Sequence, residues 1–76
     1  MSMFGERIKL LRLTKGFTQA VLAQRLRMSL PVIHTWEYGG LPRAAVIPRL
    51  ADILGVDPTE LAELYMADIL IRKEGK

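Results

Sequence analysis

Hydrophobic residues recur along this chain at helical spacing, and short polar or glycine-containing breaks separate the repeats. The first repeat carries Phe4, Ile8 and Leu11 and predicts a helix over about 3–15, which Gly16 ends. No segment alternates between apolar and polar residues in the way that a half-buried strand does. The pattern therefore predicts an all-α fold.

Two short helices follow close together in the next part of the chain. Thr18 is a good N-capping residue for a helix over 19–26, and a short turn comes after it. Ser29 is a second N-capping residue and predicts a third helix that runs to about Tyr38, where two glycines end it.

The remaining apolar repeats predict a fourth and a fifth helix. The fourth covers roughly 44–54 and ends at Gly55, and Pro48 either delays its regular part or kinks it. The run 57–60 combines an N-capping aspartate, a proline and a glutamate that could close a capping box. It predicts a helix over about 58–72, so that residues 1–76 form a single five-helix domain.

The stretch 19–38 has the spacing of two short helices that cross at a steep angle across a tight turn. Where they cross, their backbones come close, so a small residue is needed there, and Ala23 meets that need. Ile33 and Trp36 are expected to fill the core from the second of these helices, and Met28 to plug the turn. This arrangement exposes the N-terminal end of the third helix, a geometry that fits the major groove of DNA.

Charge is distributed unevenly along the chain. Residues 1–49 hold eight basic and two acidic side chains, whereas residues 50–76 hold three basic and six acidic ones. Either one end of the protein faces a polyanion, or these charges are simply solvated helix surface. Double-stranded DNA is the partner that we expect.

Several classes of protein are disfavoured by composition. The chain has no cysteine and one histidine, so we expect no metal site, no cofactor and no enzymatic activity. It shows no apolar run of membrane-spanning length and no signal-peptide pattern, so we expect no membrane partner and a cytoplasmic protein. Nothing in the pattern indicates a small-molecule ligand.

At these positions the chain resembles the Cro/CI-type (XRE family) helix-turn-helix regulators. The matching stretches occur in order between about residues 4 and 64: Phe4-Gly5-Glu6-Arg7-Ile8, Lys15-Gly16-Phe17-Thr18-Gln19, Leu22-Ala23, Leu26, Ser29, Ile33, Trp36-Glu37, Gly39, Pro42 and Leu50-Ala51-Asp52-Ile53-Leu54-Gly55-Val56. Arg27 stands where the family commonly has glycine, and a left-handed backbone there would cost roughly 1 kcal/mol.

The resemblance implies a lambda-repressor-like domain that binds a two-fold operator as a homodimer and regulates transcription, most simply as a repressor. Four positions match residues that contact phosphate in the family: Gln19, Ser29, Arg43 and Arg12. The positions that usually meet base edges are Leu30, Pro31, Val32 and Thr35. Four further residues match the structural positions of the motif: Ala23, Ile33, Trp36 and Glu37. Arg12 and Glu37 match a pair that links the first helix to the third.

The residues at the start of the third helix do not decide whether this helix contacts bases or another protein. Leu30, Pro31 and Val32 are apolar where relatives commonly carry polar residues, and they cannot form paired hydrogen bonds with bases. Specificity would then rest on Thr35, on DNA shape and on His34, which is otherwise a solvated residue. The alternative is a protein-interaction module on the same fold, such as an antitoxin or co-regulator.

The last helix, 58–72, is apolar on more than one stripe and needs a second cover. A homodimer interface is one answer, and its candidate residues are Leu64, Tyr65, Ile69 and Leu70. The other answer is that this helix folds back over the domain itself, covering Leu10 and Leu13.

Overall fold

The computed structural model describes residues 2–74, and all regular structure within them is helical. The elements are α1 (Met3–Thr14), α2 (Gln19–Leu26), α3 (Leu30–Glu37), the 3₁₀ helix η1 (Ala44–Val46), α4 (Ile47–Leu54) and α5 (Pro58–Glu74). The predicted all-α fold with five α-helices is confirmed, and most helix boundaries agree with the prediction. The largest difference is the start of the fourth helix, at Ile47 instead of about 44. No helix in the described part of the chain is long and apolar enough to cross a membrane.

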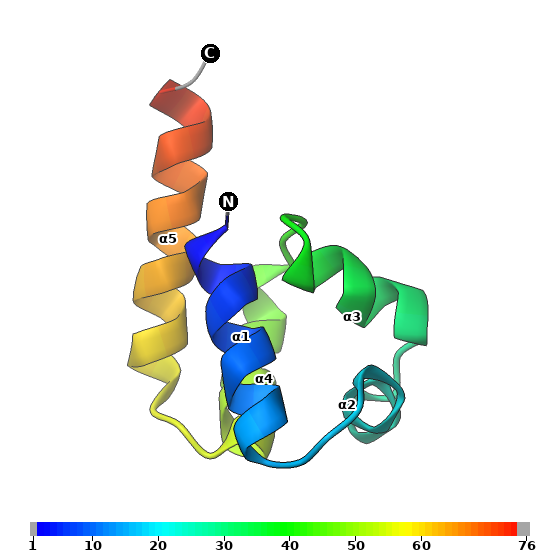
Figure 1. Cartoon of the computed structure of the whole chain (residues 1–76). Coiled ribbons are helices and arrows are strands. Elements are labelled where there is room, and N and C mark those ends of the chain that lie inside the picture. The colour runs from blue at the N-terminus through cyan, green and yellow to red at the C-terminus, as the bar shows by residue number, and fades with distance from the viewer. Residues whose placement is uncertain (1, 75–76) are drawn as a thin grey trace.

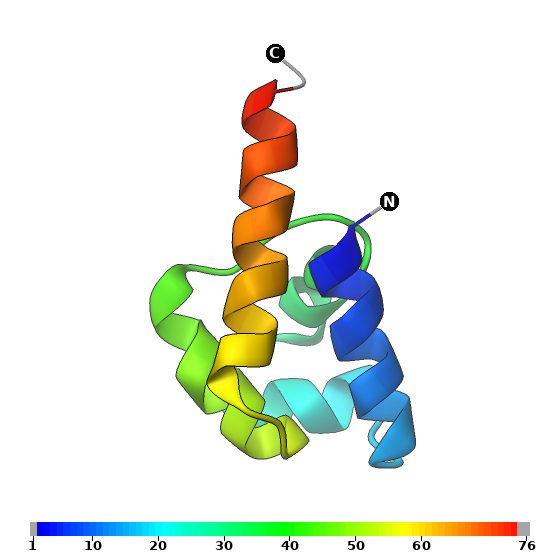
Figure 2. The ribbon, with the colours of Figure 1, turned by 90° about the vertical axis from the view of Figure 1, so that its left-hand side faces the viewer.

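The helices are arranged around α1 and α4, which lie between α5 on one side and the α2–α3 pair on the other (Figure 1). The C-terminal turns of α5 extend past the rest of the molecule in both views (Figures 1 and 2). Every α-helix contributes to one core, whose members are Phe4, Ile8, Leu22, Ala23, Leu26, Ile33, Trp36, Ile47, Leu50, Ala51, Leu54 and Leu61. Ala23, Ile33 and Trp36 are therefore buried as predicted.

The N-terminal ends of α2 and α3 are held differently. The Thr18 hydroxyl caps α2 by accepting a hydrogen bond of 3.0 Å from the Val21 N–H. Ser29 occupies the predicted N-cap position of α3 with an extended backbone, but its side chain makes no capping hydrogen bond. The Ser29 hydroxyl is therefore not committed to α3.

Pro48 delays the regular part of the fourth helix, which was one of the two outcomes expected. Residues 44–46 form a 3₁₀ turn, and α4 begins at Ile47 with Pro48 in its first turn. Proline is tolerated there because the first N–H groups of a helix have no acceptor within that helix.

One expectation about apolar side chains is wrong, and the alternative in which the last helix folds back over the domain holds for the core but not for Leu10 and Leu13. Met28 does not plug the turn, because it is 37% exposed. Leu10 and Leu13 are also exposed, so α5 does not cover them. Instead α5 packs against α4 and against the face of α1 that carries Phe4.

The apolar residues of α5 divide into inward and outward groups, which corrects the expected dimer surface. Leu64 and Tyr65 pack against the domain's own core. The Tyr65 hydroxyl donates a hydrogen bond of 2.7 Å to the Pro42 carbonyl, and its ring meets Phe4 edge-on. Ile69 is half-buried. Of the four candidates for the dimer interface, only Leu70 is exposed.

The predicted start of α5 at Pro58 is correct, but Glu60 does not close the expected capping box. The Asp57 carboxylate accepts a hydrogen bond of 2.8 Å from the Thr59 N–H, as an N-cap does. Glu60 pairs instead with Arg7 of α1, with 2.6 Å between Oε2 and Nε. The pair adds a polar tie between α1 and α5 in place of a capping box.

Asp68 of α5 is buried and caps the N-terminus of α1. Its carboxylate accepts hydrogen bonds from the Ser2 hydroxyl at 2.6 Å and from the N–H groups of Met3 and Phe4 at 3.1 and 3.0 Å. Burial by itself would raise the pKa of Asp68. The three hydrogen bonds and the positive charge of Arg72 outweigh burial and lower the pKa below its ordinary value of 3.8.

Asp68→Asn is expected to destabilise the protein by about 1–3 kcal/mol at pH 7, because an amide cannot replace the second acceptor oxygen. Since the native pKa lies below the unfolded one, the carboxylate stabilises the fold fully above about pH 4. That contribution is lost as the pH falls through the native pKa. Urea unfolding at pH 7 and at pH 3 should therefore show a difference from wild type that shrinks on acidification.

The matched control is Asp52→Asn, on the exposed face of α4, for which a change within about 0.5 kcal/mol is expected. Equal effects of the two substitutions at pH 7 would contradict the capping role of Asp68.

Arg27 adopts the left-handed conformation at the end of α2, with φ 59° and ψ 44°. The N–H of Arg27 donates to Gln24 and that of Met28 to Ala23, which closes the helix and turns the chain toward α3. This geometry favours glycine, because a side chain in this region costs roughly 1–2 kcal/mol.

Arg27→Gly is expected to stabilise the protein by up to about 1 kcal/mol, since relief of strain exceeds the extra entropy of glycine in the unfolded chain. Gln24→Gly, in the regular part of α2, should instead cost about 1 kcal/mol. Thermal unfolding of both variants measures the contrast. Destabilisation of similar size in both would show that the backbone at Arg27 is not strained.

Candidate nucleic-acid interface

The outer surface of α3 is open over its N-terminal half and along one side. The exposed residues there include Ser29, Leu30, Pro31, His34 and Thr35. Four of the five residues expected to face bases are therefore available to a partner. Val32 is only partly available, because it is half-buried and packs against the core. Val32 lies beside Ile33 and Trp36 on the inward side of α3. The prediction treats residues 30–32 as one exposed tip and does not take this neighbouring inward stripe into account.

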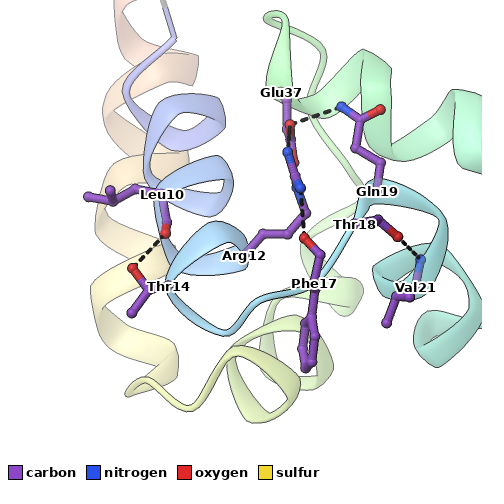
Figure 3. Close-up of polar contacts among 8 residues, drawn as sticks. All are labelled: Leu10, Arg12, Thr14, Phe17, Thr18, Gln19, Val21 and Glu37. Carbon is purple, nitrogen blue, oxygen red and sulfur yellow. Dashed lines mark hydrogen bonds and ion pairs between the residues drawn. The ribbon is translucent and has the colours of Figure 1, made fainter.

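Glu37, the last residue of α3, is the centre of a buried polar network (Figure 3). Its side chain is completely buried and accepts two hydrogen bonds from Arg12, at 2.6 Å from Nε and 3.0 Å from Nη2. The Gln19 amide donates a third, at 3.0 Å to Oε1. The expected link between the first and third helices is confirmed, and it extends to α2.

Arg12 holds a second element in the same network. Its Nη1 donates a hydrogen bond of 2.8 Å to the Phe17 carbonyl, in the turn between α1 and α2 (Figure 3). The Arg12 side chain is only 8% exposed, and all three of its nitrogens have partners within the protein. Arg12 is thus fixed by partners within the protein, as the predicted link to Glu37 implies, and the expected contact of Arg12 with phosphate stays a prediction. Removing one partner of such a pair typically costs about 3–5 kcal/mol.

Gln19 stands at the first position of α2, as expected, but its side-chain nitrogen is already bound to Glu37. A contact between Gln19 and phosphate would therefore involve the second N–H of its side-chain amide, or its backbone N–H at the positive end of α2. The role of Gln19 in phosphate binding stays a prediction.

Gly5 is a structural residue of this site that the sequence pattern did not single out. A Cβ atom at Gly5 would collide with the carbonyl oxygen of Trp36 and would lie 3.1 Å from that of Glu37. Only glycine lets α1 approach the end of α3 this closely. A glycine inside an otherwise regular helical repeat was the available signal, because such a residue lowers helix stability and usually marks a close contact.

Basic side chains surround the α2–α3 pair. Arg43 is exposed at the N-cap of η1 and makes no capping hydrogen bond there. Arg25, Arg27 and Arg49 are also exposed, and the Arg49 guanidinium donates to the Arg25 carbonyl at the end of α2. The Arg25 guanidinium lies 4.7 Å from the centre of the Phe17 ring. These groups give the helix pair a positive electrostatic field.

No group of three or more potential ligands gathers to hold a metal ion within the described residues. The surface of α3 presents an exposed apolar tip, a few polar side chains and flanking positive charge. A single α-helix presented in this way has the dimensions of the DNA major groove.

Comparison of the sequence with known proteins identifies the family to which the chain belongs. The model of the helix-turn-helix domain matches residues 3–64. The uncharacterized HTH-type transcriptional regulator YazB of Bacillus subtilis (strain 168) is 40% identical over 60 residues, which cover 78% of this chain and 87% of YazB. No solved structure gives a significant match.

Two similar proteins are much longer than this chain. The HTH-type transcriptional regulator RamB of Mycobacterium tuberculosis is 39% identical over 59 residues, which cover 76% of this chain and 12% of RamB. The propionyl-CoA carboxylase regulator of Cereibacter sphaeroides is 41% identical over 58 residues, covering 75% and 13%. Taken with the fold, the match over residues 3–64 shows that the chain belongs to the helix-turn-helix domain family of transcriptional regulators, with which the XRE-type resemblance is consistent.

Proposed function

We propose that this protein is a sequence-specific DNA-binding regulator that inserts α3 into the major groove and acts as a repressor, as a homodimer on a two-fold operator. The observation that carries the proposal is the open N-terminal half of α3, held in place at its other end by the buried Glu37 network. A dimer that covers successive major grooves excludes other proteins from the site, which is the simplest form of repression.

Phosphate contacts would provide most of the affinity. Arg43 supplies an exposed positive charge directly after α3, and the uncapped Ser29 hydroxyl lies at its start. The N-terminus of α2 adds backbone N–H groups at Gln19. These groups surround α3 and would fix its orientation in the groove.

The apolar tip of α3 would contact bases without hydrogen bonds. Leu30 is 44% exposed and Pro31 is exposed beside it, so both can meet thymine methyl groups. The Thr35 hydroxyl donates to the Pro31 carbonyl at 2.9 Å, which leaves its oxygen as an acceptor only. Sequence preference would therefore depend partly on DNA shape.

The exposed apolar side chains of α5 favour the homodimer. Leu70 and Ile71 are 52% and 58% exposed, and Met66 is 51% exposed one turn before Leu70. A domain of this size buries only roughly 60% of the surface of its unfolded chain, so a partner subunit would stabilise it appreciably. Leu70 is the one earlier candidate that remains fully available for this interface.

Binding to duplex DNA should weaken steeply between roughly 50 and 200 mM salt, because each phosphate contact releases a counterion. Arg43→Ala should reduce the slope of log K against log salt by about 0.9 per protomer. Fluorescence anisotropy with a labelled duplex measures both. Arg72→Ala, which removes an exposed positive charge on α5, is the matched control and should leave the slope unchanged. Salt-independent binding would exclude this mechanism.

Selection from a random duplex library with the purified protein tests specificity and symmetry together. An enriched palindrome with half-sites about one helical turn apart is the expected result. An enriched sequence without symmetry would contradict the homodimer, and no enrichment at all would contradict sequence-specific binding.

A protein-interaction module is the second candidate, and one observation favours it. An apolar groove of about 610 Å³ runs beside α3 and is lined by Met28, Val32, Trp36, Leu41 and Val46, with Ser29, Pro42 and Arg43 also in its wall. Thr35→Glu separates the two functions, because it puts a negative charge on the exposed side of α3 and outside the wall of this groove. DNA retention should be lost if the first proposal is correct, whereas a module that uses the groove would keep its protein partner.

A further inference from the structure

An aromatic stack runs along the exposed side of α3. The rings of His34 and Tyr38 lie one helical turn apart, with 4.5 Å between their centres and 30° between their planes. Tyr38 is 68% exposed, and the Lys9 ammonium of α1 lies 5.8 Å from the centre of its ring. Both ring residues share a helix face with Leu30, because residues four apart in a helix lie above one another.

Three of the side chains expected to meet base edges, those of Leu30, Pro31 and Thr35, cannot donate a hydrogen bond to a base. Leu30 and Pro31 are apolar, and the proton of the Thr35 hydroxyl is already used by the Pro31 carbonyl. His34 carries a ring N–H in either of its neutral forms, and it is exposed. On the outer surface of α3 it is therefore the side chain best equipped for directional hydrogen bonding.

We infer that His34 is the residue that selects a base by hydrogen bonding, and that Tyr38 is a positioning residue that fixes the plane of the imidazole by stacking. The inference rests on the proposed binding of α3 in the major groove. The base class is guanine, which presents two adjacent acceptors, O6 and N7, at the groove edge, whereas adenine presents one acceptor beside a donor.

Stacking on Tyr38 gives the His34 ring a fixed orientation, which a lone histidine on a helix surface lacks. A free imidazole on a helix samples several orientations, and fixing one of them on binding costs conformational entropy. The Tyr38 ring holds the imidazole plane before DNA arrives, so less of that cost falls on the complex. Lys9 lies beside the stack as a positive charge without base specificity, and it would strengthen binding to any sequence.

The test starts from the duplex that wild-type protein selects, and from duplexes in which each G·C pair is replaced in turn by A·T. Competition binding should show one pair per half-site at which His34→Ala removes discrimination, by roughly fivefold or more. Tyr38→Ala should lose discrimination at that same pair, and Tyr38→Phe, which keeps the stacking ring, should restore it. Circular dichroism melts confirm that each variant is folded.

Lys9→Ala is the matched control, and it should weaken binding to all the duplexes equally while leaving the preferred bases unchanged. The inference is overturned if His34→Ala keeps every wild-type preference, or if Tyr38→Ala keeps the preference that His34→Ala loses. Failure of the wild-type protein to bind any duplex at low salt would instead overturn the proposed function, and the inference with it. The two failures are thereby distinguishable.

Discussion

The buried pairing of Arg12 with Glu37 is the interaction on which the arrangement of this protein depends. Two charges removed from water are stable only if each is fully hydrogen-bonded, and here the partners come from α1, α2, α3 and the turn at Phe17. The network therefore fixes the angle of α3 from its C-terminal end. The N-terminal end of α3 stays exposed at Ser29, Leu30 and Pro31, and the Ser29 side chain makes no capping hydrogen bond there.

Much of the fold could be predicted from the sequence, because helix periodicity and capping residues act locally. Thr18 predicts the start of α2, and Gly16 and Gly55 predict the ends of α1 and α4. The structure has these helix ends at the predicted positions. Contacts between distant segments could not be predicted in this way. Asp68 looks like an ordinary acidic residue of an amphipathic helix, and only the packing of α5 beside α1 shows that it caps another helix.

The candidate site was predicted less completely, for a related reason. Spacing identified which residues lie on α3, but it could not show which of their polar atoms are already bound within the protein. Arg12 and the Gln19 amide face Glu37, and the Thr35 hydroxyl faces its own helix. In the sequence Tyr38 marks only the end of the predicted third helix, because periodicity does not encode the contact of its ring with His34.

The contact of Asp68 with the start of α1 has a consequence for cooperativity. The Ser2 and Asp68 side chains lie 66 positions apart, so their hydrogen bond joins the first and last helices of the fold. If α5 detached, α1 would lose its cap at Met3 and Phe4 as well as its apolar cover, so neither helix can unfold independently at low cost. A substitution that removes the Asp68 carboxylate would therefore act on nucleic-acid binding through the fraction of molecules that are folded.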